Sequence, residues 1–295
     1  MDRRRFLKTG ARLAGAALLA PAASLWAAGR PDAKGPPDLV HACGDPAAAV
    51  IGALDALGGM GRFVKDGDVV AVKPNASFDA PPEWGATTHP EVLAAVLEAC
   101  GEAGARRVLV VDHIMPGARR SFERTGTAEA VSRFKFAKLV SLDEERVYSA
   151  ADIPRGRALR KAQIPVALQK AGVFINLPSA KSHNATGVSL GMKNLMGLVW
   201  DRHAFHRDFD LHQGIADLAT LLWPQLIVLD AIYLLKTGGP AGPGDVDEHG
   251  GVVAGVDPVA VDAYGAALTN WNGRMLQPDQ VAYIRHAEEH GLGTT

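Results

Sequence analysis

The sequence predicts an α/β protein: a single Rossmann-like domain with a mostly parallel sheet and helices on both faces. Short apolar, β-branched runs alternate with longer helix-like segments, which is the order expected of βαβ units. About 265 residues follow the N-terminal segment described below, enough for one large domain. The best-defined strand-like runs are 68–73, 108–112, 173–177 and 226–230.

Weaker patterns predict the remaining elements. Pro90 stands in a favoured first-turn position, so a helix is expected from there to about residue 103. Segment 116–164 is basic and irregular, which predicts a peripheral excursion from the sheet. Segment 238–251 is rich in glycine and proline, which predicts a loop. Loops of this length in a compact domain usually have a function. The other expected elements are a weak strand at 39–42, helices at 46–57 and 126–134, strands at 136–141 and 146–149, a helix that ends near residue 171, and closing helices at 258–268 and 278–290.

Residues 1–30 have the features of a twin-arginine signal peptide. Arg3 and Arg4 open a basic head, and an uncharged run rich in alanine and leucine follows from 13 to 28. This run is too short and too rich in alanine for a membrane span, which needs about 20 strongly apolar residues. A basic head, an apolar run and small residues are typical of secretory signals, and the arginine pair specifies the route. We therefore expect the twin-arginine translocase to export a soluble α/β domain, 31–295, to the periplasm, without a stable membrane span.

Composition narrows the class of protein. Residues 1–30 carry six basic side chains and one acidic one, and the whole chain has a net charge of −1, so the remaining domain carries −6. A mildly acidic domain argues against a general nucleic-acid binder, and any anion site must be a local basic pocket. Cys43 and Cys100 are the only cysteines, too few to hold an iron–sulfur cluster. They could pair in an oxidising compartment, although Cys100 ends an apolar helix-like run and is expected to be buried.

Polar side chains follow four of the predicted strands at their carboxyl ends, where open α/β sheets usually bind ligands. Several of these side chains are lysines and histidines, which repel one another in a shared crevice unless an anion neutralises them. Neighbouring positive charge also lowers lysine pKa values and can leave one lysine able to act as a base. The candidate catalytic residues are Lys181, Lys193 and, as the acid or base, His183; the candidate substrate-binding residues are Lys73, Asn75, Asn194, His212, Gly239 and Gly242.

Two further groups of residues have two interpretations each. Segment 201–212 contains three histidines among several aspartates, which fits either metal ligation or a solvated loop whose histidines cap helices. Asp257 precedes Pro258, the arrangement of a helix N-cap. It could instead join Asp230 and Asp262 in holding a divalent hard cation. The glycine-rich loop matches no nucleotide-binding fingerprint, so the cofactor stays unknown, with a divalent metal as one alternative.

Five motifs occur in order along the chain. They are Lys73-Pro74-Asn75, Pro178…Lys181-Ser182-His183, Lys193-Asn194-Leu195-Met196-Gly197, Gly239-Pro240…Gly244 and Asp257-Pro258-Val259-Ala260-Val261-Asp262. Together they resemble the bacterial and archaeal family called domain of unknown function 362, over residues 69 to 293. The resemblance implies an α/β fold and a shared site built from those motifs, with a reaction that is largely unassigned. Some members carry ferredoxin-type cysteine clusters, which this chain lacks, so an electron-transfer role is not implied.

The residues and the resemblance together predict an exported enzyme without redox chemistry that acts on a small anionic molecule. Two alternatives stay open. One is a binding or chaperone-like accessory protein that uses the same pocket without turnover. The other is a redox accessory protein that has lost, or borrows, its cluster.

Overall fold

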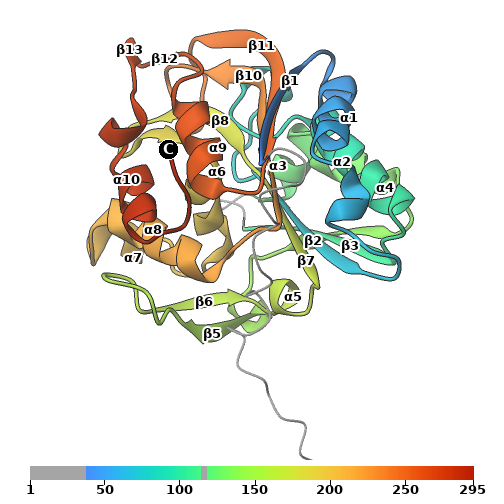
Figure 1. Ribbon diagram of the computed structural model, residues 1–295. Helices are drawn as coiled ribbons and strands as arrows, with labels where there is room; N and C mark the ends of the chain where they lie inside the picture. The colour runs from blue at the N-terminus through green and yellow to red at the C-terminus, as the bar shows by residue number, and fades with distance from the viewer. Residues whose placement is uncertain (1–37, 114–117) are drawn as a thin grey trace, which may run out of the picture.

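The central feature of the fold is a nine-stranded sheet with helices on both faces (Figure 1). The computed structural model describes residues 38–113 and 118–295, so the expected signal peptide, 1–30, lies outside the described residues. No helix within these two ranges is long and apolar enough to cross a membrane. The predicted class, an α/β fold with a mostly parallel sheet, is confirmed.

The main sheet is parallel at its centre and antiparallel at one edge. The strands are β1 (Leu39–Cys43), β2 (Val69–Pro74), β3 (Arg107–Asp112), β4 (Ala137–Ser141), β5 (Tyr148–Asp152), β6 (Lys161–Pro165), β7 (Val173–Leu177), β8 (Ser179–His183), β9 (Gly187–Ser189), β10 (Leu226–Leu235), β11 (Val246–Gly255), β12 (Asn270–Trp271) and β13 (Arg274–Met275). The order is β1-β11-β10-β7-β2-β3-β4. Strands β10, β7, β2, β3 and β4 run parallel, whereas β11 is antiparallel to both of its neighbours. Strands β8 and β9 form a hairpin beside β10.

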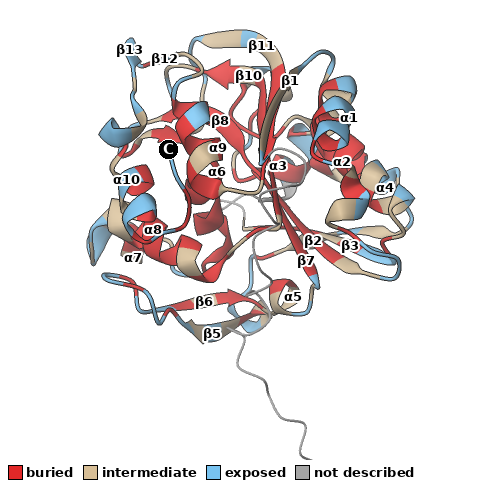
Figure 2. Cartoon of the chain, viewed as in Figure 1, coloured by how far each residue is buried: buried red, intermediate tan, exposed pale blue. Residues whose placement is uncertain are grey.

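Alternate residues of the central strands pack against two different groups of helices. The helices are α1 (Pro46–Ala56), α2 (Pro90–Glu102), α3 (Ala118–Arg124), α4 (Thr127–Ser132), α5 (Val166–Gln169), α6 (Gly191–Asn194), α7 (Ala204–Arg207), α8 (Leu211–Leu221), α9 (Pro258–Ala266) and α10 (Ala282–Glu289). Val70 and Val72 belong to the apolar core under α1, α2 and α4. Ala71 belongs to the core under α6, α8, α9 and α10. Because successive strand residues point to opposite faces, the near-continuous apolar runs of the sequence fill both cores (Figure 2).

Three predicted segments differ from the structure. The strand expected within the peripheral excursion is β4, and it joins the main sheet beside β3. The stretch expected as a loop, 238–251, contains the first part of β11, because Gly251 can lie flat against β1: a Cβ there would be 2.9 Å from the carbonyl of Ala42. The polar stretch after β7 forms the β8–β9 hairpin. What is peripheral is the separate two-stranded sheet of β5 and β6.

Asp217 of α8 anchors the chain between β5 and β6. Its Oδ2 accepts hydrogen bonds from the backbone N–H groups of Arg157, Ala158 and Leu159, at 2.9, 2.7 and 2.8 Å. Its Oδ1 lies 2.8 Å from Nε2 of His290. Burial raises the pKa of Asp217, but the hydrogen bonds outweigh it and the net effect lowers the pKa.

We expect Asp217→Ala to destabilise the protein by about 3 kcal/mol, because it leaves buried donors without an acceptor. The control is Asp208→Ala, which removes an exposed carboxylate. Urea unfolding at pH 7 measures both. Because the folded-state pKa of Asp217 is lowered, its contribution is present above the unfolded value of about 3.9 and is lost as pH falls through the folded value. The difference between Asp217→Ala and wild type should therefore shrink in acid. Equal stability of the two variants at pH 7 would contradict this role.

Candidate active site

A buried ion pair lies at the carboxyl ends of β2 and β3. Lys73 Nζ donates to Oδ1 of Asp112 at 2.7 Å and to the carbonyl of Pro74 at 2.6 Å, and both charged side chains are fully enclosed. Oδ2 of Asp112 accepts the backbone N–H of Ala76 at 2.6 Å. Burial lowers the pKa of Lys73, and the carboxylate opposes that shift. The charge of Lys73 is therefore balanced within the protein.

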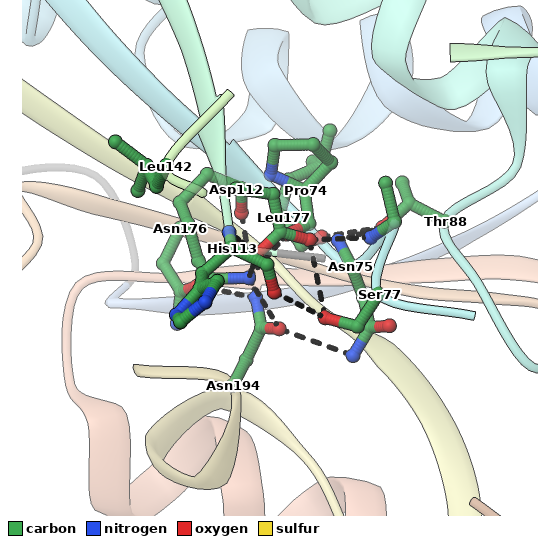
Figure 3. Close-up of polar contacts among 12 residues, drawn as sticks. Pro74, Asn75, Ser77, Thr88, Asp112, His113, Leu142, Asn176, Leu177 and Asn194 are labelled. Atoms are coloured by element: carbon green, nitrogen blue, oxygen red, sulfur yellow. Dashed lines mark hydrogen bonds and ion pairs between the residues drawn. The ribbon is translucent and has the colours of Figure 1, made fainter. Parts of the chain in front are cut away.

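Three asparagines extend this pair into a network (Figure 3). Asn194 at the end of α6 accepts from Lys73 Nζ at 3.0 Å and from Nδ2 of Asn75 at 3.1 Å. Nδ2 of Asn194 donates to Oδ1 of Asn176 at 2.9 Å. Asn176 is the register partner of Lys73 across β2 and β7, which brings these side chains together. The structure thus brings Lys73, Asn75 and Asn194 together, as predicted. Their polar atoms form hydrogen bonds with one another, whereas the sequence predicted that they contact a substrate.

Lys181 and Lys193 are also buried, at 1% and 8% exposure, but neither has an acidic partner among the described residues. Lys181 Nζ donates to the carbonyl of Ala86 and, at 3.2 Å, to Oδ1 of Asn75, and lies 4.7 Å from the ring centroid of Phe78. Lys193 Nζ lies 3.4 Å from the sulfur of Met196. Within the described part of the chain, neither lysine forms an ion pair with a carboxylate.

The environment lowers the pKa of both lysines. Burial is the main cause for Lys181, and the charges of Lys193 and Lys73 add to it, so its pKa lies well below the usual value. Burial and the nearby Arg202 lower the pKa of Lys193 to about 8. A pKa near 8 leaves Lys193 mostly protonated at neutral pH, yet able to release its proton at modest cost.

These lysines open onto a cavity of about 910 Å³. Its positive charge comes from Lys181, Lys193 and Arg202, all buried or half-buried. The acidic side chains of its lining are exposed to solvent, so the inner part is positive and the rim is mixed. The remaining lining includes His113, His183, His203, Asn75, Asn194, Gln163, Ser77, Ser189, Phe78, Met196, Gly197, Trp200 and Pro240, and the acidic residues are Asp143, Glu145 and Asp201.

Two more polar side chains, those of His183 and Arg202, line this cavity. His183 at the end of β8 accepts the N–H of Ala185 at Nδ1 (3.1 Å), so its neutral form carries a proton on Nε2 and can donate it. Arg202 donates to the carbonyl of His113 at 3.0 Å. Arg202 belongs to the segment expected to be a solvated loop or a metal site, and it was not predicted as a site residue. Arg202 has a basic side chain, lies close to Trp200 in the sequence and follows the motif that begins at Lys193. These are the features of the sequence that could have identified it.

Four predicted substrate-binding residues do not line the cavity. Lys73 lies beneath it, because Asp112 holds its ammonium. Gly239 allows the loop to approach β8, since a Cβ there would be 1.9 Å from the carbonyl of Ser182. Gly242 has a positive φ of 70° and packs on Trp84. His212 stacks on Tyr283, and its Nδ1 has no partner among the described residues.

The candidate cation ligands Asp230, Asp257 and Asp262 do not converge on one point. Asp230 accepts the N–H groups of His89 and Ile232, and Asp257 caps α9. Asp262 accepts the N–H groups at the start of α6, at 2.7 and 3.0 Å, which fixes the helix that carries Lys193. Backbone donors thus use these carboxylates, and within the described residues they form no group of three ligands. In segment 201–212 the capping side chains are aspartates and not the expected histidines: Asp201 accepts the N–H of Ala204 and Asp210 that of Gln213, whereas His203 at the start of α7 makes no side-chain cap hydrogen bond.

Comparison with known proteins identifies the family. The model of the family described as domain of unknown function 362 matches residues 70–267. The chain belongs to this family. The thylakoid-associated protein of Synechocystis sp. is 30% identical over 249 residues, which cover 82% of this chain and 74% of that protein. The lactate racemase apoprotein of Thermoanaerobacterium thermosaccharolyticum has 14% identity and a TM-score of 0.47 over 68% of this chain; the chain spans about half, 52%, of that structure.

Because Lys73 has an acidic partner and Lys193 has none among the described residues, replacement by methionine should destabilise the protein far more at Lys73 than at Lys193. Lys73→Met should lower the free energy of unfolding by about 3 to 5 kcal/mol, because it leaves the Asp112 carboxylate buried without its partner. Lys193→Met should change it by less than about 1 kcal/mol, or raise it, because it removes a buried charge that has no acidic partner. Urea unfolding at pH 7 measures both variants. Similar losses in the two would contradict the distinction between a structural and a ligand-facing lysine.

Proposed function

We propose that this chain is an exported enzyme that binds a small anionic substrate in the basic cavity and moves a proton without redox chemistry of its own. The observation that carries the proposal is the pair of buried lysines, Lys181 and Lys193, that line the cavity and have no acidic partner in the described part of the chain. Burying unpaired positive charge lowers the free energy of unfolding, and a bound carboxylate or phosphate offsets this loss by pairing with the charge. Proteins keep such destabilising arrangements mainly at functional sites.

The residues around the cavity fit distinct roles. Arg202 and Lys181 hold the anionic group, with Lys181 oriented by Asn75. Lys193 has a pKa of about 8 and exchanges a proton near neutral pH. His183 donates a hydrogen bond or proton from Nε2. Trp200, stacked on His113 at a centroid distance of 5.4 Å, supplies an apolar wall for the rest of the substrate.

The family also leaves room for a binding protein without turnover or for a redox accessory. A binder would need the cations alone, whereas an enzyme would also need a group that exchanges a proton near neutral pH, a role that fits Lys193 with its pKa of about 8. A redox accessory would need cysteine ligands. Cys100 is buried in apolar surroundings that raise its thiol pKa to about 12, so Cys43 is the one accessible thiol. A cluster held by four thiolates of this chain is therefore excluded.

Anion binding should weaken as pH rises through the pKa of Lys193. Sulfate is a suitable probe, because its own charge does not change between pH 6.5 and 9.5. We expect sulfate affinity, measured by isothermal titration calorimetry, to fall by about tenfold or more over this range as Lys193 loses its charge.

A matched pair of variants tests the assignment of that pH dependence to Lys193. Lys193→Met should bind sulfate weakly at pH 6.5 and should lose most of the pH dependence. The exposed Lys161→Met removes an equal charge away from the cavity and should behave like wild type. Undetectable binding to the wild-type protein, or the same affinity at both pH values, would contradict the proposal.

Export should depend on the arginine pair of the expected signal. Replacing Arg3 and Arg4 together by lysine should leave the precursor in the cytoplasm, because the translocase recognises the pair. Immunoblots of periplasmic and cytoplasmic fractions measure this, with Arg12→Lys as the control. Mature protein in the periplasm of a strain without the twin-arginine translocase would refute this route.

A further inference from the structure

A second cluster of reactive side chains lies at the antiparallel edge of the sheet, outside the cavity lining. His41 and Cys43 alternate along β1 and so share one face, and His249 comes from the neighbouring strand β11. Nε2 of His41 lies 3.4 Å from Sγ of Cys43 and 3.1 Å from Nε2 of His249. In residues 38–113 and 118–295, this is the one group of three or more His, Cys, Asp or Glu side chains whose ligand atoms all lie within 4.8 Å of one another.

These separations fit tetrahedral metal coordination. With metal–nitrogen bonds of about 2.0 Å and metal–sulfur bonds of about 2.3 Å, two nitrogen ligands lie about 3.3 Å apart, and a nitrogen and a sulfur about 3.6 Å apart. The two separations that involve His41 are therefore within about 0.2 Å of the values for a bound ion, and the ligand atoms of Cys43 and His249 lie within 4.8 Å of each other.

Two neighbouring residues favour a ligand set over a chance contact. Gly251 is the register partner of Cys43, and a Cβ there would lie 3.0 Å from Nε2 of His41 and 3.2 Å from Sγ of Cys43. Glycine therefore keeps open the space where these atoms meet. Nδ1 of His41 lies 3.0 Å from the hydroxyl of Tyr264 on α9. When Nδ1 donates to that hydroxyl, the Nε2 lone pair points toward the cluster, the usual outer-sphere arrangement of metal-bound histidine.

We propose that His41, Cys43 and His249 bind one transition-metal ion, zinc or copper, which ties the edge strand β1 to β11. Thiolate and imidazole ligands suit these ions, whereas magnesium and calcium prefer oxygen. The Cys43 thiol releases one proton when the ion binds, and both imidazoles bind in their neutral form. Cys43 is exposed, so solvent can fill the fourth position.

Metal titration of the tag-free mature protein tests this site. The protein is reduced, stripped with a chelator and titrated with zinc(II), cobalt(II) or copper(I); elemental analysis after desalting gives the stoichiometry, and competition with a chromophoric chelator gives the affinity. We expect one ion per chain, with thiolate-to-cobalt charge transfer in the near ultraviolet. Tighter retention of zinc or of copper identifies which of the two ions the site takes.

Matched variants assign the ligands. Cys43→Ser and His249→Ala should weaken binding by about a hundredfold or more and remove the thiolate band or shift the ligand-field spectrum. Cys100→Ala and His286→Ala remove the same side-chain types elsewhere and should bind like wild type. Circular dichroism confirms that each variant is folded, and the rate of Cys43 modification by a disulfide reagent should fall when metal is added to wild type. Absence of a retained ion in wild type, or unchanged affinity in Cys43→Ser and His249→Ala, would overturn the proposal.

Discussion

The ion pair between Lys73 and Asp112 is the interaction on which the candidate active site depends. It lies at the carboxyl ends of two parallel strands, where the sheet leaves backbone groups and side chains to be satisfied by the following loops. Asn194 accepts a hydrogen bond from the Lys73 ammonium, and so the end of α6 is fixed relative to β2. The residue before Asn194 is Lys193, so the same contact sets where that ammonium can lie.

The site therefore combines balanced and unbalanced charge within a short distance. Lys73 is neutralised by Asp112, and its polar neighbours are saturated by one another. Lys181 and Lys193 share the same desolvation but have no acidic partner among the described residues. A protein that needed only stability would gain from apolar residues at both positions. Their retention over a cavity is consistent with a ligand that supplies the missing negative charge.

The sequence was sufficient to predict the fold class, because the central strands are buried on both faces and read as continuous apolar runs. The sequence did not predict β11, because strand pairing there is non-local. This strand begins in a glycine-rich stretch with no strand propensity of its own, and it forms a strand because it hydrogen-bonds to β1 and β10. The convergence of Lys73, Asn75, Lys181 and Asn194 followed from the rule that strand ends meet. The partner of each lysine did not, because Asp112 comes 39 residues after Lys73 and only the register of β2 and β3 brings them together.

The central claim is that the cavity holds an anion between Lys181, Lys193 and Arg202. The most direct measurement is a crystal structure of the protein soaked in selenate, with anomalous diffraction recorded at the selenium edge. This account predicts a selenium peak in the cavity, with selenate oxygens within hydrogen-bond distance of Lys193 Nζ. A cavity without such a peak at saturating selenate, or a Lys193 ammonium paired with one of the rim carboxylates, would contradict it.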